Sequence, residues 1–232
     1  IRSCLVGSEM CIRDRVIAVD DFKMTSYTNL SEGSVKNLYL LPGYLGNDNS
    51  SYMLSALMYF SKRGWNIHRL NPVDHGDTLM MNKKFFNALH HKIVGRALEI
   101  LINKNDGDHY LMGFSFGGNF SLRIAMLNAG SKFKRVVAIS PMIDHEKSLE
   151  GLSDFFNKYY IKKWVNTFRA KEAMWKDYDL RKFYKMTDIK EMMEEWLPFV
   201  LPEYDFVNLR ECVNRSDISA EKMAHLKTRW SV

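Results

Sequence analysis

The chain has 232 residues, 46% of them hydrophobic, which is enough apolar material for the core of one globular domain with an insertion. The net charge of +6 is spread along the chain instead of forming one basic block, which argues against nucleic acid as a partner. No apolar run approaches the roughly 18 to 20 residues that cross a bilayer, and no signal peptide is apparent, so the sequence predicts a soluble protein.

Cysteine and histidine usage argues against a bound metal. The three cysteines, Cys4, Cys11 and Cys212, have neither metal-ligand spacing nor the pattern of a disulfide framework, and the seven histidines form no ligand set. Cysteines without a disulfide pattern are typical of a reducing compartment. We therefore expect a cytoplasmic protein that needs no metal and no other cofactor.

The two ends of the chain differ from the rest. Residues 1–15 show no clear periodicity and look like translated adapter sequence, so we leave them out of the fold prediction. Residues 227–232 stop where a new strand is expected, and we interpret them as the start of a truncated strand or an artefactual end. The sequence thus predicts a sheet whose last strands are missing.

Strand and helix patterns alternate between residues 34 and 140. This order predicts an α/β fold in which helices wind a mostly parallel sheet, with a core of residues 16–147. The predicted strands are 35–41, 65–70, 109–114 and 135–140, and the predicted helices are 51–63, 85–102 and 118–127.

The segment 148–226 has helical patterns, many aromatic residues and no strand-like run. A helical insertion that follows a sheet strand is typical of a cap over a substrate pocket. The alternative is a set of ordinary packing helices with no role at the site.

The run from Tyr110 to Asn119 contains the pattern G-x-S-x-G, with a strand before it and a helix after it. Gly113 and Gly117 would allow a tight strand-to-helix turn that presents Ser115 as a nucleophile for acyl transfer. The alternative is that these small residues only let a helix pack closely on a strand.

An acyl transferase or hydrolase also needs two backbone donors for the oxyanion. The first candidate is the N–H of Phe116, in the first turn of the helix that follows Ser115. The second is the N–H of Tyr44, in the L-P-G-Y-L-G loop that follows the first predicted strand. The alternative is that Pro42-Gly43 forms only a plain turn at the end of a strand.

Four residues could in principle serve as the general base or as the group that orients it. His75, in the loop N-P-V-D-H-G-D-T, precedes the serine in the chain, so we expect it to be packed beneath that loop while Asp74 and Asp77 tie the loop together. Asp144 follows a later strand and is a candidate to orient the base, but it and its neighbour His145 cannot easily both converge on one serine. His225 lies before the next expected strand and is disfavoured.

Four segments together resemble the alpha/beta-hydrolase superfamily. They are P-G-Y-L-G, N-P-V-D-H-G-D-T, G-F-S-F-G-G-N and the strand that runs to Asp144, and the loop motif is most similar to the YheT-like branch of carboxylester hydrolases. The resemblance covers roughly residues 34–228. It implies that Ser115 is the nucleophile, that Tyr44 and Phe116 supply the oxyanion amides, and that His75 is structural.

The same resemblance implies that the catalytic Asp and His follow two strands beyond Lys227, so this chain is expected to be a nearly inactive fragment. Its parent would hydrolyse small carboxylic esters with an apolar group, including lipid or acyl esters. Two other classes stay open: a non-catalytic binding scaffold of the same fold, and a peripheral membrane module. The membrane-facing residues of that module would be Lys162, Lys163, Trp164, Phe168, Arg169 and Trp175.

Overall fold

The computed structural model describes residues 12–200, 208–218, 223 and 230–231. In this part of the chain, strands form one seven-stranded sheet in the order β1-β2-β4-β3-β5-β6-β7. The pairs β1/β2 and β2/β4 are antiparallel, and all other pairs are parallel. The strands are β1 (Ile12–Val19), β2 (Phe22–Asn29), β3 (Lys36–Leu41), β4 (Asn66–Asn71), β5 (Asp108–Phe114), β6 (Arg135–Ile139) and β7 (Trp230–Ser231).

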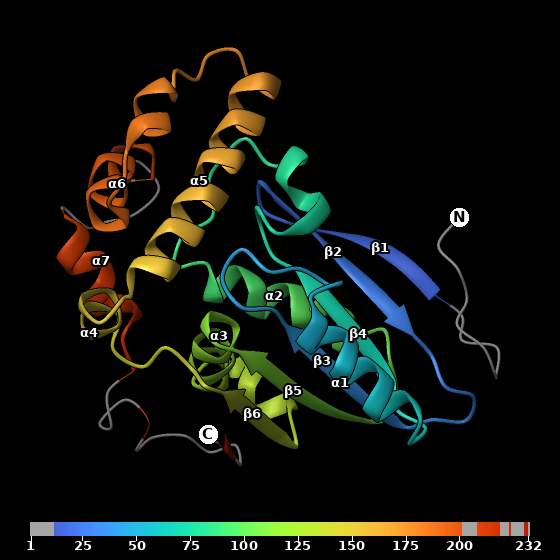
Figure 1. The fold of residues 1–232 in the computed structure, drawn as a ribbon. Coiled ribbons are helices and arrows are strands. Elements are labelled where there is room, and N and C mark those ends of the chain that lie inside the picture. Colours follow the sequence, from blue (N-terminus) through green and yellow to red (C-terminus); the bar gives the residue numbers. More distant parts are fainter. Residues whose placement is uncertain (1–11, 201–207, 219–222, 224–229, 232) are drawn as a thin grey trace.

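Helices cover both faces of the sheet, as Figure 1 shows. In β3, Leu38 and Leu40 pack with α1 (Ser51–Ser61), whereas Tyr39 and Leu41 belong to the core shared with α2 (His91–Ile102) and α3 (Phe116–Ala125). This alternation follows from the two-residue period of a strand. The expected α/β architecture is therefore confirmed.

The hairpin of β1 and β2 corrects the expectation for the start of the chain. Residues 12–15, which the sequence prediction left out, pair with residues 26–29 of β2. Ile17 and Val19 are buried with Phe22 and Met24 in the main core, and Asp20, with a φ of 50°, forms the tight turn. The apolar residues at 16–19 and at 22 and 24, on either side of Asp20 and Asp21, are the sequence signal that could have revealed this hairpin.

The second helix is shorter than predicted, because α2 begins at His91 and not at residue 85. Phe85 packs in the core of the helical insertion, while its neighbour Phe86 packs in the main core. The N–H of Phe86 donates to the carboxylate of Asp74 (2.8 Å). The segment 81–90 that carries both side chains consists of turns, bends and irregular backbone and forms no helix.

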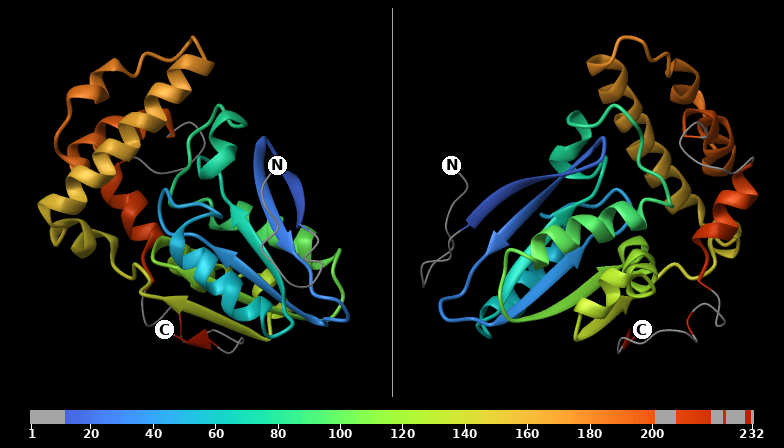
Figure 2. Two further views of the ribbon diagram at one scale, coloured as in Figure 1. Left: turned by 45° about the vertical axis from the view of Figure 1, so that its right-hand side comes forward. Right: turned by 180° about the vertical axis from the view of Figure 1, so that it is seen from behind.

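The helices after β6 form a layer of their own, which both views of Figure 2 show apart from the sheet. They share a core that includes Trp164, Phe168, Phe183 and Trp196. We call this layer the cap. Its helices are α4 (His145–Glu150), α5 (Asp154–Met174), α6 (Ile189–Trp196) and α7 (Leu209–Ser216), with 3-10 turns at Arg181–Lys185 and Leu197–Phe199.

The cap packs on residues that follow the carboxyl ends of three strands. Tyr44 follows β3 and contacts Trp164, Asp74 follows β4 and pairs with Lys171, and Phe116 follows β5 and contacts His145. No helix among the described residues is long and apolar enough to cross a membrane.

Candidate active site

Ser115 occupies the single position between β5 and α3. Its backbone has φ 51° and ψ −114°, a conformation that residues with a side chain rarely adopt. The N–H of Ser115 donates to the carbonyl oxygen of Ile139 in β6 (2.8 Å), and its own carbonyl oxygen accepts from the N–H of Asn119 (3.0 Å). The sheet on one side and the helix on the other thus hold this turn.

The two flanking glycines are required by close backbone contacts. A Cβ atom on Gly113 would lie 2.0 Å from the carbonyl oxygen of Gly117, and one on Gly117 would lie 2.3 Å from that of Pro42. Neither site has room for a side chain. The pattern G-x-S-x-G is therefore imposed by this turn and by the loop after β3.

The loop after β3 lies directly beside Ser115. A Cβ atom on Gly43 would be 3.5 Å from the Cβ of Ser115, and the N–H of Gly43 donates to the hydroxyl of Tyr52 (3.0 Å). Among the described residues, none accepts a hydrogen bond from the N–H of Tyr44 or Phe116. Phe116 is the first residue of α3, where backbone donors have no intrahelical partner.

His75 supports this loop from below. Its Nε2 accepts from the N–H of Leu45 (3.0 Å), and its Nδ1 lies 2.8 Å from the carbonyl oxygen of Val73, so Nδ1 carries the proton. Burial lowers the pKa of His75 to about 4, which keeps the ring neutral near pH 7. Because both ring nitrogens are engaged, His75 positions the loop and has no nitrogen left for Ser115.

Two lysines of α5, in the cap, hold the loop after β3 and the loop after β4. Nζ of Lys163 donates to the carbonyl oxygen of Leu45 (2.8 Å). Nζ of Lys171 pairs with the carboxylate of Asp74 (2.7 Å) and donates to the carbonyl oxygens of Lys83 (3.1 Å) and Lys84 (2.8 Å). Sequence reasoning missed both lysine contacts, since the partners are about one hundred residues apart and no local pattern marks them.

The two aspartates of the loop after β4 tie it to distant elements. Asp74 is fully enclosed, and burial raises the pKa of its carboxyl although Lys171 opposes the shift. Asp77 accepts from the hydroxyls of Thr25 (2.6 Å) and Tyr27 in β2. Asp77 therefore fixes the loop after β4 to the hairpin of β1 and β2, and Asp74 fixes it to the cap.

Asp144 and His145 have different partners. The carboxylate of Asp144 caps α4 by accepting from the N–H of Lys147 (2.9 Å), and this bond lowers the pKa of Asp144. Nδ1 of His145 lies 3.1 Å from the carboxylate of Asp217, and burial lowers the pKa of His145. No histidine in the described part of the chain hydrogen-bonds to the Ser115 hydroxyl, and His225 lies outside the described residues.

A cavity of about 90 Å³ lies between the cap and the core. It begins at Phe116 and Tyr44, the residues adjacent to Ser115 and Gly43, and extends to Trp164 and Trp196 of the cap. Its lining is almost entirely apolar. The sequence had indicated an aromatic cap, but not which aromatic side chains line the cavity.

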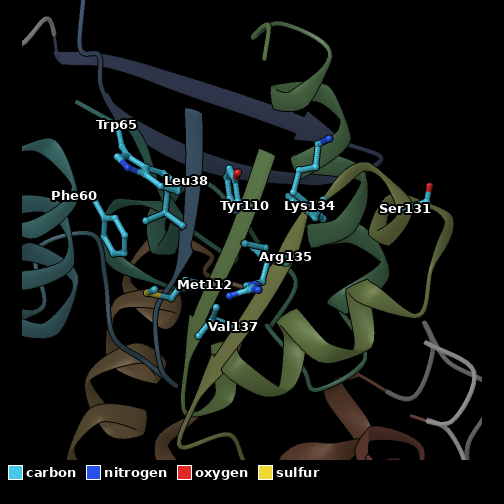
Figure 3. Close-up of a pocket in the computed structure, with 11 residues that line it drawn as sticks. Leu38, Phe60, Trp65, Tyr110, Met112, Ser131, Lys134, Arg135 and Val137 are labelled. Carbon is cyan, nitrogen blue, oxygen red and sulfur yellow. The ribbon is translucent and has the colours of Figure 1, made fainter. Parts of the chain in front are cut away.

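A larger groove of about 790 Å³ lies on the face of the sheet that α1 partly covers (Figure 3). It exists because α1 covers β3 and β4 but leaves Tyr110 and Met112 of β5 and Val137 of β6 partly exposed. Since Ser115 and the residues after β3 and β4 lie at the carboxyl ends of the strands, this groove is separate from the candidate active site.

The membrane-facing patch considered from the sequence does not form. Trp164 and Phe168 are 5% and 1% exposed and belong to the cap core, and Lys163 holds the loop at Leu45. The exposed aromatic residues of α5 are Phe155, Phe156 and Tyr159. Within the described ranges, no three His, Cys, Asp or Glu side chains are grouped so that they could hold a metal ion.

No protein-family model matches the sequence, and no curated protein has a similar sequence. Solved structures do match. An esterase of Pyrococcus furiosus aligns over 72% of each chain with 19% identity and a TM-score of 0.54.

Est1E of Butyrivibrio proteoclasticus, solved with ferulic acid bound, aligns with 18% identity and a TM-score of 0.51 over 60% of this chain and 57% of its own. An alpha-beta serine hydrolase homologue of Coxiella burnetii aligns with 19% identity and a TM-score of 0.50 over 60% of this chain and 68% of its own. At such identities the likeness concerns the fold, and the chain has the alpha/beta-hydrolase fold.

Proposed function

We propose that this protein hydrolyses carboxylic esters with Ser115 as the nucleophile. The observation that carries the proposal is the strained backbone of Ser115 at the turn from β5 to α3, with φ 51°. Such strain costs about 1 to 3 kcal/mol, and it persists where the surrounding structure needs it, often at active sites. The amides of Tyr44 and Phe116 next to this turn, which have no acceptor among the described residues, support the same function.

In the proposed reaction, the Ser115 hydroxyl attacks the ester carbonyl carbon and gives its proton to a histidine base. The carbonyl oxygen takes up the electron pair of the broken π bond, and the amides of Tyr44 and Phe116 stabilise the resulting oxyanion. The C–O bond to the alcohol then breaks, and the histidine returns the proton to the alcohol. Water repeats these steps to release the acid and restore Ser115.

The base of this scheme is proposed to lie outside the described residues. His145 is the described histidine that pairs with a carboxylate beside Phe116, but it does not contact the Ser115 hydroxyl. A His145→Ala variant is therefore expected to keep its reactivity toward an activated phosphonate. Complete loss of reactivity in a folded His145→Ala variant would instead identify His145 as the base.

Membership of the YheT-like branch and a cytoplasmic location are part of the same proposal. The branch is supported by the loop Asn71 to Thr78, and the location by the absence of a disulfide pattern in the sequence. The apolar cavity under the cap supports an ester with an apolar group.

Labelling with a fluorophosphonate probe tests the nucleophile. We expect covalent labelling of the wild type and of Ser131→Ala, a control at an exposed serine of a 3-10 helix, and none of Ser115→Ala. Peptide mapping by mass spectrometry identifies the labelled residue. Absence of labelling in a folded wild type would contradict the proposal and favour a non-catalytic binding scaffold of the same fold.

A further inference from the structure

We infer that the cavity beneath the cap is the acyl site and that it accepts short, neutral acyl groups of two to about four carbons. This inference rests on the proposed ester hydrolysis. It adds the substrate class and the side chains that set the chain length. Three properties of the cavity carry it: its place, its polarity and its size.

The place of the cavity fits the acyl group. Tyr44 and Phe116, whose amides are the proposed oxyanion donors, both line it, so the cavity lies next to the residues that would hold the reacting carbonyl. The alcohol must leave and water must take its place during the reaction, whereas the acyl group stays bonded to Ser115. A narrow space between cap and core therefore suits the acyl group better than the leaving group.

The polarity of the lining excludes charged acyl groups. None of the described residues that line the cavity is Asp, Glu, Lys or Arg. Several of its polar side chains are bonded elsewhere: the hydroxyl of Ser148 donates to the carbonyl oxygen of Asp144 (2.5 Å), that of Ser216 donates to the carbonyl oxygen of Val213 (2.7 Å), and the amide oxygen of Asn87 accepts from the N–H of Leu89 (2.8 Å). The indole N–H of Trp196 has no acceptor among the described residues and can donate to a neutral oxygen. A carboxylate would enter without a cation to pair with, at a large cost.

Two further polar groups of the lining lead to the same result. Burial raises the pKa of Cys212 to about 11, so its thiol is uncharged near neutral pH. His145 directs Nδ1 to Asp217, and its Nε2 is buried without a hydrogen-bond partner among the described residues, in a ring whose pKa is lowered by burial. The cavity therefore offers its occupant contacts with apolar surface.

The size limits the chain length. A dry protein cavity of about 150 Å³ holds benzene, which corresponds to about 25 Å³ per carbon. At that ratio the cavity of about 90 Å³ holds about four carbons. Longer chains would need the space that Met193 of α6 and Leu149 of α4 occupy at the cavity wall.

The first test compares p-nitrophenyl acetate, butyrate and octanoate, which share one leaving group. We expect kcat/KM for butyrate to exceed that for octanoate by at least about tenfold, since a methylene that does not fit lowers the rate by factors of this order. Equal or faster turnover of octanoate would overturn the inference while leaving the proposed hydrolysis intact.

Two substitutions change the cavity in opposite directions. Met193→Ala enlarges it and is expected to raise kcat/KM for octanoate about tenfold relative to butyrate. Leu149→Phe fills it and is expected to lower turnover of butyrate while sparing acetate. Glu194→Ala, an exposed neighbour in α6, is the matched control and should leave the ratio of the esters unchanged. An unchanged ratio in both folded cavity variants would contradict the assignment of this cavity.

A binding measurement separates the cavity from the chemistry. The neutral, symmetrical ketones 4-heptanone and 8-pentadecanone carry the carbonyl of an ester but cannot be hydrolysed, and each presents the same chain on both sides of the carbonyl. In the Ser115→Ala variant, we expect only the shorter ketone to shift the indole signals of Trp164 and Trp196 in NMR spectra. Size-selective ketone binding without turnover of any ester would refute the proposed function alone, and binding of both ketones with equal affinity would refute the size limit.

Discussion

Strained residues are concentrated at one edge of the sheet. Of the five described non-glycine residues with positive φ, four follow consecutive parallel strands: Leu45 after β3, Asp74 after β4, Ser115 after β5 and Ser140 after β6. Each such residue costs about 1 to 3 kcal/mol of folding free energy. This cost falls at the edge of the sheet where the proposed chemistry takes place, and contacts elsewhere in the fold must offset it.

Removal of the strain at Ser115 should stabilise the protein. Glycine adopts φ 51° without steric cost, so we expect Ser115→Gly to be more stable than Ser115→Ala by about 1 kcal/mol, after the larger chain entropy of unfolded glycine is subtracted. Urea unfolding of the two variants measures this difference, and neither variant should react with the phosphonate probe. A Gly variant less stable than the Ala variant would show that the backbone at Ser115 is not strained.

At the scale of elements, α5 is the connection between cap and core. Lys171 is fully buried against Asp74 and three backbone carbonyl oxygens, including that of Asn82. A buried carboxylate that loses its only cation is strongly destabilising, whereas loss of both charges is tolerated better. The Asp74 backbone, with φ 61°, also suits asparagine.

We therefore expect Lys171→Met to lower the free energy of unfolding by about 3 to 5 kcal/mol, and addition of Asp74→Asn to restore part of that loss. Lys162→Met, at an exposed position of the same helix, should change it by less than about 0.5 kcal/mol. Urea unfolding of the three variants is the measurement. If the double variant were less stable than Lys171→Met alone, the charge of Asp74 would not be the cause.

Local patterns predicted the elements, but not the contacts between them. Residues 109–119 identified β5, α3 and Ser115, because apolar runs, glycines and helical spacing act over a few residues. The start of α2 was misplaced because Phe85 and Phe86 fit a helical period until tertiary packing separates them. The bond from Lys163 to Leu45 spans 118 residues, and such pairs have no signature in a single sequence.

At the scale of the whole molecule, four buried histidines link folding to pH. Burial lowers the pKa of His68, His90 and His91 to about 3 and that of His75 to about 4, from 6.5. The unfolded chain therefore binds more protons than the folded chain between pH 6.5 and about 4, and stability falls as pH falls through this range. The raised pKa of Asp74 has the opposite effect on stability, but it is a single group and the histidines are four.

At pH 5 each of these histidines should reduce the free energy of unfolding by about 2 kcal/mol relative to pH 7. Because the total stability of a domain is about 5 to 15 kcal/mol, we expect extensive unfolding near pH 5. Urea midpoints between pH 7.5 and pH 5 measure the effect. A midpoint that stays constant over this range would show that the histidines titrate normally in the folded protein.

Since one helix carries both Lys163 and Lys171, a displacement of α5 would release the carbonyl oxygen of Leu45 and the carboxylate of Asp74 together. Such a displacement would loosen the loop that carries Tyr44, and the return of the helix would fix this loop again. A ligand that holds α5 in place would then position the two proposed oxyanion donors and exclude water from the site at the same time. Without such a ligand, the protein would react poorly with water or with esters that do not fit the site.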